Sequence, residues 1–298
     1  MQNFLTVDVE EWYHVCGVGG ALAPERWDTL ASRVELTTDL VLELLADRRV
    51  RATFFVLGWI AERHPSLIER IAREGHEIGS HGFSHRRVYE IGPDEFGAEL
   101  ARSCQAIQAA GGGRPRGFRA PEWSINDRSL WALDVVARHG FRYDSSMTPL
   151  RLVGNPAYPQ APHLRGTPSG PLLEVPPLVR RRFGQNVPLG GGWGLRMCPA
   201  SVALREIAAR NRRGEPATLF VHPWEMDPDP PRVSLPWALA FSHYYRLAGY
   251  RERLNDIIGG AAFGPIGESV DAAWPRLAAE ANDPSRLEPG VAGGRPRE

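Results

Sequence analysis

Two histidines four residues apart, His81 and His85, are the side chains of this sequence whose type and spacing best suit a metal ion. They lie in a segment rich in glycine and serine, and residues four apart in a helical turn project to the same side. Neutral imidazole is the commonest side-chain ligand of catalytic divalent metals. A histidine pair alone is a weak signal, so a metal site also requires a third ligand, with a base and an acid nearby for hydrolysis.

The composition excludes several other kinds of site. The 298 residues carry 35 basic and 35 acidic side chains, so no positive field indicates nucleic acid or an anionic membrane as a partner. Three cysteines far apart in the sequence do not predict a disulfide framework or a thiolate zinc site. Any metal must therefore be held by histidine and carboxylate.

The start of the sequence indicates a compartment. Residues 1–8 lack the basic start and apolar run of a signal peptide, and no stretch approaches the about 18 apolar residues of a membrane span. We therefore expect a cytoplasmic protein.

Short apolar runs alternate with amphipathic segments through the first half of the chain. This pattern predicts strands at residues 4–9, 51–57 and 76–79, and helices at residues 34–49, 59–74 and 93–110. Such an order favours parallel strands in a wound sheet or barrel, in which the chemistry lies at the C-terminal ends of the strands. Asp8, Glu10, His81 and His85 would all lie there.

The rest of the chain continues the alternation. Further strand ends at residues 117–123, 141–146 and 217–221 carry or precede Arg119, Asp144 and His222. Further helices are predicted at residues 127–139, 199–212 and within 236–258, and another strand at 172–176. Residues 151–171, rich in proline and glycine, predict a long surface excursion. The glycine run at 190–194 predicts a close backbone approach beside a groove, with Trp193 either exposed to a ligand or packed on the core.

Five short motifs resemble, in order and separation, those of the polysaccharide deacetylases, a family that includes chitin, chitooligosaccharide and peptidoglycan deacetylases. The motifs are Thr6-Val7-Asp8-Val9-Glu10, His81-Gly82-Phe83-Ser84-His85, Arg119-Ala120-Pro121, Asp144 and Phe220-Val221-His222. Each is weak alone, but the five together cover roughly residues 3–225. Further details, such as the glycine run before Trp193, look closest to a bacterial subfamily found with exosortase and exopolysaccharide loci.

The resemblance implies an α/β fold. It implies a distorted (β/α) barrel of about seven parallel strands over residues 1–229, with a C-terminal helical extension packed on the barrel over residues 230–282. Residues 283–298 lack apolar anchors and have the composition of a disordered tail.

The resemblance also implies a ligand set in which this chain departs from the family. The second aspartate of the family, a metal ligand, aligns with Val9, which cannot bind metal. A subset of the family places the ligand one residue later, which makes Glu10 the third ligand beside His81 and His85. Strand alternation turns Glu11 to the other side, so Glu11 is the less favoured alternative. Zinc is the expected metal, with cobalt or another first-row ion as the alternative.

Two histidines and one carboxylate leave an open position at which a metal polarises an acetamide carbonyl and lowers the pKa of bound water. Asp8 can take the proton from that water, and His222 can protonate the leaving amine. Arg119 is expected to orient Asp8, Asp144 to orient either Arg119 or His222, and a backbone N–H near Glu122 to bind the oxyanion. The candidate contacts to a sugar are Trp12, Tyr13, Pro121, Glu122, Trp123, Trp193 and Trp224.

We therefore expect a metal-dependent hydrolase that removes N-acetyl groups from amino sugars of a polysaccharide or its precursor. One alternative is a related hydrolase that acts on a small non-sugar amide. The other is a non-catalytic carbohydrate-binding module on the same fold, which the displaced carboxylate and Glu122 favour. The presence of Asp8 and His222 argues against the module, because a binding protein needs neither a base nor an acid.

Overall fold

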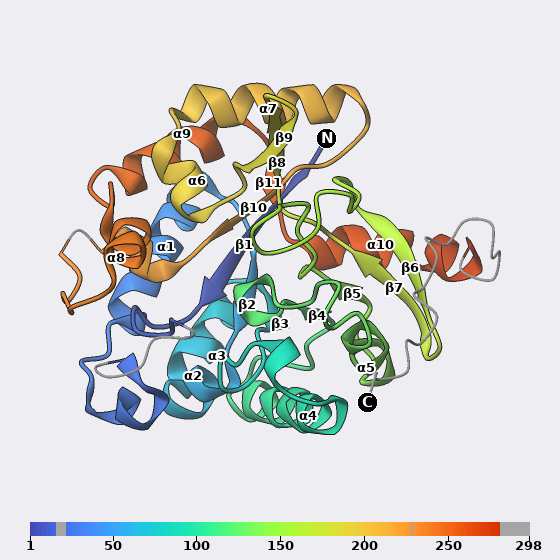
Figure 1. Cartoon of the computed structure of the whole chain (residues 1–298), viewed down its shortest axis with the longest axis horizontal. Helices are drawn as coiled ribbons and strands as arrows, with labels where there is room; N and C mark the ends of the chain where they lie inside the picture. Colours follow the sequence, from blue (N-terminus) through green and yellow to red (C-terminus); the bar gives the residue numbers. More distant parts are fainter. Residues whose placement is uncertain (16–21, 228, 281–298) are drawn as a thin grey trace.

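A computed structural model of the chain describes residues 1–15, 22–227 and 229–280 (Figure 1). The tail predicted to be disordered, residues 283–298, lies outside the described residues. A curled sheet forms the centre of the molecule, and helices lie around it. Among the described residues, seven strands run parallel in the order β10 (Thr218–Val221), β1 (Asn3–Val9), β2 (Thr53–Val56), β3 (Glu77–Ser80), β4 (Gly117–Phe118), β5 (Tyr143–Asp144) and β7 (Gly170–Glu174). The predicted barrel of about seven parallel strands is thereby confirmed.

The two ends of this curled sheet meet beyond β7. The N–H of Leu178, four residues after β7, donates to the carbonyl of Thr218 in β10 at 2.9 Å. The N–H of Phe220 donates to the carbonyl of Gly190 at 2.8 Å. A side chain on Gly191 would lie 2.1 Å from the Phe220 carbonyl oxygen, so only glycine allows this close approach, as the glycine run predicted. The barrel is distorted because irregular chain replaces regular pairing at this seam.

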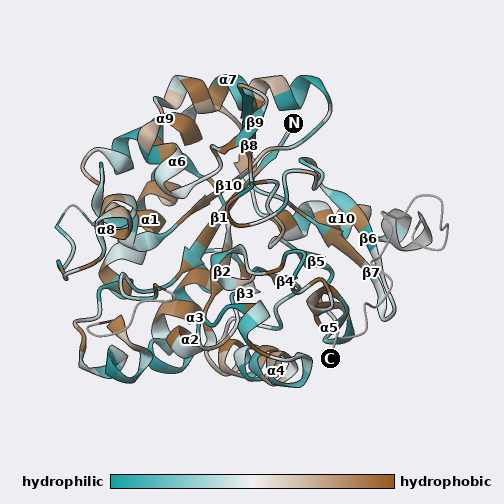
Figure 2. Cartoon of the chain, viewed as in Figure 1, coloured by the Kyte–Doolittle hydropathy of each residue, from teal (hydrophilic) through white to brown (hydrophobic). Residues whose placement is uncertain are grey.

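Alternation along β1 divides its side chains between the helices and the barrel interior. Leu5, Val7 and Val9 are fully buried in the largest hydrophobic cluster, which the outer helices complete. Thr6 and Asp8 point to the interior. A strand buried on both faces is typical of a parallel sheet covered by helices, and Figure 2 shows hydrophobic residues concentrated on the central strands. The same alternation therefore sends the polar side chains of β1 toward the interior of the barrel.

Apart from one short helix over residues 192–197, which was not predicted, the helices that cover the barrel follow the predicted order. They are α1 (Val34–Arg48), α2 (Gly58–Arg63), α3 (Pro65–Arg73), α4 (Pro93–Ala109), α5 (Ala132–Arg138), α6 (Gly192–Met197), α7 (Ala200–Arg212) and α9 (Tyr250–Gly260). The single helix predicted over residues 59–74 is wrong, because the chain breaks at His64. Pro65 has no N–H for a continuing helix, and it begins α3 as its first residue instead.

The structure contains two strand pairings that the sequence analysis did not predict. The predicted surface excursion contains a regular strand, β6 (His163–Thr167), which pairs antiparallel with β7 at the edge of the sheet. A separate antiparallel hairpin of β8 (Val179–Arg182) and β9 (Gln185–Pro188) was not predicted. Both lie at an edge or outside the barrel, where half-exposed polar residues obscure the hydrophobic alternation.

The C-terminal residues cover two different parts of the barrel. Helix α8 (Trp237–Tyr244) lies near α6 and α1, whereas β11 (Phe263–Gly264) pairs with the first residues of β1. Helix α10 (Ile266–Glu280) begins against β2 and β3, where the N–H of Ile266 donates to Thr53 Oγ1 at 2.9 Å. The N-terminal end of the barrel is thus closed, and its C-terminal end carries the polar residues. Within the described ranges, no helix is long and apolar enough to cross a membrane.

Candidate metal centre

Three buried side chains converge at the C-terminal ends of β1 and β3. The ligand atoms of Glu10, His81 and His85 all lie within 4.8 Å of one another. Glu10 Oε2 is 2.8 Å from His85 Nε2 and 3.7 Å from His81 Nε2. Two imidazoles and one carboxylate form a donor set suited to zinc or another first-row divalent ion, and their mutual spacing fits one shared ion.

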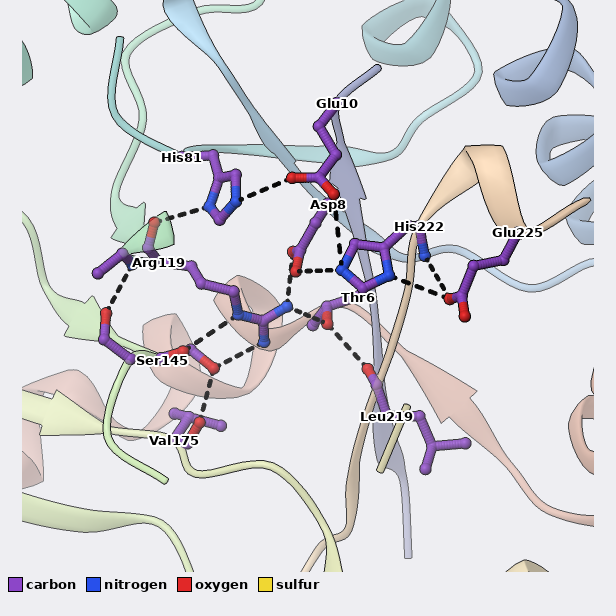
Figure 3. Close-up of polar contacts among 12 residues, drawn as sticks. Thr6, Asp8, Glu10, His81, Arg119, Ser145, Val175, Leu219, His222 and Glu225 are labelled. Carbon is purple, nitrogen blue, oxygen red and sulfur yellow. Dashed lines mark hydrogen bonds and ion pairs between the residues drawn. The ribbon is translucent and has the colours of Figure 1, made fainter. Parts of the chain in front are cut away.

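Neighbouring groups orient two of these ligands, and Figure 3 shows the contact made by His81. His81 Nδ1 lies 2.8 Å from the backbone carbonyl oxygen of Arg119 and donates a hydrogen bond to it. The other ring nitrogen, Nε2, is therefore left to act as the ligand atom. The indole Nε1 of Trp224 donates to Glu10 Oε1 at 3.1 Å. Burial alone would raise the pKa of Glu10, but the neighbouring His85 and His222 hold it well below its usual value. Glu10 is therefore ionised, as a metal ligand requires.

Glu11 points away from this cluster, as strand alternation predicted. Its carboxylate accepts hydrogen bonds from the hydroxyl of Ser32 and from the backbone N–H groups of Arg33 and Val34. These groups lie at the start of α1, whose first N–H groups have no partner within the helix. Glu11 thus caps a helix, and the geometry favours Glu10 as the ligand.

Asp8 and Arg119 form a buried ion pair beside the three ligands. Arg119 Nη1 lies 2.7 Å from Asp8 Oδ1, and the arginine is only 1% exposed. The guanidinium also donates to Thr6 Oγ1 at 2.7 Å and to Ser145 Oγ at 2.8 Å. The predicted pairing of Arg119 with Asp8 is therefore present in the structure, and the second oxygen of Asp8 remains directed toward His222.

His222 enters the site from the end of β10. Its Nε2 lies 3.9 Å from Asp8 Oδ2 and 3.8 Å from Glu10 Oε1, whereas its Nδ1 lies 3.0 Å from Glu225 Oε2. Burial alone would lower the pKa of His222, but the carboxylates of Glu10, Glu225 and Asp8 outweigh burial and raise it to about 9.

The sequence interpretation missed Glu225. The signal that could have revealed it is its spacing of three residues from His222, which a single 3₁₀ turn over Pro223–Met226 folds back.

Asp144 lies behind the site. It accepts hydrogen bonds from the hydroxyl of Ser146 at 2.5 Å and from its backbone N–H at 3.2 Å, and it packs against Glu174. Burial and the Asp144 charge raise the pKa of Glu174 well above its usual value, so one proton stays between the two carboxyls. The sequence predicted that Asp144 contacts either Arg119 or His222. In the structure, Ser145 contacts Arg119 and Glu225 contacts His222 instead.

A cavity of about 710 Å³ opens over these residues. Of the predicted site residues, it is lined by Asp8, Glu10, His81, His85, Arg119, Glu122, Trp123, Trp193, His222 and Trp224. Trp193 lines this cavity and is 45% exposed, so it is not packed on the core.

Three of the predicted sugar contacts do not line the cavity. Trp12 and Tyr13 are buried together with Trp27 in an aromatic cluster that also contains Trp224, and the indole of Trp12 donates to the carbonyl of Ala31. Pro121 is also buried and does not line the cavity.

Backbone strain is concentrated at this cavity. His85, Glu122 and Trp123 have φ angles of 55°, 50° and 56°, and they are three of the six non-glycine residues with positive φ in the described part of the chain. Such conformations cost about 1–3 kcal/mol each, and they persist where the surroundings impose them, most often at functional sites. Glu122 is held by an ion pair with Arg87 at 2.7 Å.

Comparisons with known proteins agree with this geometry. Residues 27–143 match the family described as polysaccharide deacetylase, and residues 145–271 match a domain of unknown function, DUF3473. The chain is 31% identical over 120 residues to a peptidoglycan-N-acetylglucosamine deacetylase of Bacillus cereus, a match that covers 36% of this chain and 44% of that protein. It is 37% identical over 98 residues to a chitooligosaccharide deacetylase of a Bradyrhizobium species, covering 33% and 42%.

A solved structure supports the fold over the whole chain. A Mycobacterium smegmatis protein assigned to the polysaccharide deacetylases superposes with a TM-score of 0.61 at 22% identity, covering 100% of this chain and 96% of that one. The chain spans less than half the length of the two curated relatives above. The family resemblance inferred from the five motifs is confirmed.

Proposed function

We propose that this chain, a member of the polysaccharide deacetylase family, hydrolyses N-acetyl groups from amino sugars of a polysaccharide or its precursor. One observation carries the proposal: Glu10, His81 and His85 share a cavity with a paired carboxylate, Asp8, and with His222. A site that only binds sugar has no use for this combination of ligands, base and acid.

A divalent metal held by Glu10, His81 and His85 supplies a Lewis acid that activates water and the amide carbonyl. Every proton transfer is then assigned to a side chain of this protein. Arg119 fixes Asp8 through Oδ1, so that Oδ2 can accept the proton of the attacking water.

His222 is the acid that protonates the leaving amine. An amine anion is too basic to leave, so the C–N bond breaks only as a proton reaches the nitrogen. With a pKa of about 9, His222 holds that proton at neutral pH.

The aromatic lining of the cavity supports a sugar as the substrate. Its walls carry the rings of Trp123 and Trp193, which offer flat apolar faces of the kind that bind the apolar face of a sugar ring. Zinc is the proposed metal from the type of ligands, and an exopolysaccharide is the proposed glycan class from the subfamily resemblance.

Acetate release tests this proposal. Protein loaded with Zn²⁺ or Co²⁺ is incubated with N-acetylglucosamine oligomers, and acetate and free amine are quantified separately. We expect equimolar acetate and amine, and no hydrolysis of small cyclic amides. Hydrolysis of the cyclic amides alone would indicate the non-sugar hydrolase, and oligomer binding without any acetate would indicate a carbohydrate-binding module.

A further inference from the structure

The region matched to the domain of unknown function contains part of the candidate site. Residues 145–271 include His222 and Glu225, whereas His81, His85 and Arg119 lie in the segment matched to the deacetylase family. The proposed general acid, His222, therefore lies in the region that matches the domain of unknown function.

One buried arginine in this region connects three of its segments. Arg196, on α6, is 2% exposed, and its Nε lies 2.9 Å from Oε1 of Glu225, which is fully buried. Its Nη1 donates to the carbonyls of Tyr245 at 2.7 Å and His243 at 3.3 Å, and its Nη2 donates to the carbonyl of Ser242. A buried carboxylate and a buried guanidinium are costly unless they are paired, and here the two charges form an ion pair.

The three carbonyls belong to the last turn of α8 and the residue after it. Carbonyls at a helix C-terminus have no partners within the helix and carry its partial negative charge, so a guanidinium is a suitable partner for them. Because the planar guanidinium donates in fixed directions, binding to this helix end also fixes the nitrogen that faces Glu225.

The same helix end supports the other face of the site. His243 stacks on Trp224 with ring centroids 4.4 Å apart, and Trp224 stacks on His222 at 5.4 Å. The imidazole of His222 is thus held edge-on by Glu225 and across its face by Trp224.

We propose that the region of unknown function completes the catalytic site by holding the general acid. In this arrangement the end of α8 fixes Arg196, Arg196 fixes Glu225, and Glu225 accepts the Nδ1–H of His222 so that Nε2 faces the cavity. Arg196 is a positioning residue for the proton donor. The inference rests on the proposed deacetylase function.

A positioned acid matters only when the leaving group needs a proton. The amine of an N-acetylated sugar needs one, whereas the phenolate released from 4-nitrophenyl acetate does not. Loss of the positioning therefore slows hydrolysis of the amide selectively. A general structural defect slows both substrates.

The test compares Arg196→Met with a matched variant. Arg210→Met removes another buried arginine, 2% exposed, which binds the carbonyl of Gln160 at 2.6 Å and pairs with Glu215, all outside the cavity. In the metal-loaded protein, we expect Arg196→Met to lower kcat on N-acetylglucosamine oligomers about 10- to 100-fold, part of the full contribution of a general acid, with KM and metal content unchanged. Its rate on 4-nitrophenyl acetate should stay within about threefold of the wild type.

Arg196→Lys, which keeps a charge near Glu225, should recover part of the lost rate. Arg210→Met should lower stability without changing the ratio of the two rates. Equal losses on both substrates in Arg196→Met, or no loss on the oligomers, would overturn the proposal.

A second measurement does not depend on activity. The Nδ1–H proton of His222, assigned by its absence in His222→Gln, should exchange slowly with solvent in NMR spectra of the metal-free wild type and of Arg210→Met. It should exchange rapidly in Arg196→Met. Slow exchange in Arg196→Met would refute the positioning role. Slow exchange in the wild type together with no acetate from any substrate would instead reject the proposed function and leave the contact itself intact.

Discussion

Replacement of Trp224 by phenylalanine tests how Glu10 is held for the metal. The indole N–H donates to Glu10 Oε1 at 3.1 Å in a buried setting, and phenylalanine removes this donor while leaving a smaller aromatic ring in its place. A hydrogen bond to a charged group contributes about 1.5–3 kcal/mol, and about 1.4 kcal/mol corresponds to a factor of ten. We therefore expect Trp224→Phe to weaken metal binding roughly 10- to 150-fold, comparable with the about 10- to 100-fold typical for partners of metal ligands.

Competition with a chromophoric chelator measures this affinity for Zn²⁺ or Co²⁺ at fixed pH. Trp27→Phe is the matched control, because its buried indole also donates a hydrogen bond, to the carbonyl of Leu22 at 3.2 Å, but not to a metal ligand. The control should bind the metal within about threefold of the wild type. An affinity unchanged in Trp224→Phe, or lowered equally in both variants, would refute the reasoning.

Two further predictions follow from the contacts of the carboxylates. Elemental analysis of His81→Ala and of Glu10→Gln should show less than one equivalent of metal. Glu11→Gln should keep the metal and lose about 0.5–2 kcal/mol of folding stability, as expected for a weakened helix cap. Metal loss in Glu11→Gln alone would show that Glu11 is the ligand and Glu10 is not. The proton shared by Glu174 and Asp144 stabilises the folded protein, and this stabilisation is complete below the usual glutamate pKa of 4.5. The stabilisation is lost as the pH rises toward the elevated pKa of Glu174 in the folded protein. The loss is at most about 1.4 kcal/mol per pH unit. Glu174→Gln, whose amide donates without titrating, should therefore raise Tm more at pH 9 than at pH 5, and an equal change at both values would contradict the shared proton.

The strand-end residues could be predicted because they depend on two regular features of the sequence. Alternating apolar and amphipathic segments indicate parallel strands, and parallel strands end at the same edge. That rule brought Asp8, Glu10, His81 and His222 together across more than 200 residues of sequence. Strand alternation also separated Glu10 from Glu11, which the structure supports through the cap on α1.

The supporting contacts could not be predicted in the same way. Arg196 meets Glu225 and the end of α8 through side-chain packing between segments whose separation no periodicity fixes. Asp144 was expected to touch Arg119 because the chain order allows it. In the structure, the adjacent Ser145 takes that contact, while Asp144 turns toward Glu174. A shift of one residue along a strand end reverses the direction of a side chain, and the sequence does not fix where each strand ends.

The aromatic residues show the same limit. Trp12 and Trp193 both lie beside polar motifs in the sequence, yet Trp12 is buried and does not line the cavity, whereas Trp193 is exposed at it. Aromatic rings suit both a core and a sugar site, so composition alone does not distinguish the two uses.

Asp8→Asn tests the central claim most directly, because it removes the proposed base and keeps the shape and the metal ligands. Metal content and acetate release are measured on the same sample of this variant and of the wild type, with N-acetylglucosamine oligomers as the substrate. We predict a full equivalent of bound metal and no measurable turnover in Asp8→Asn. Turnover at the wild-type rate with the metal bound would contradict the assignment of Asp8 as the base and, with it, the proposed reaction.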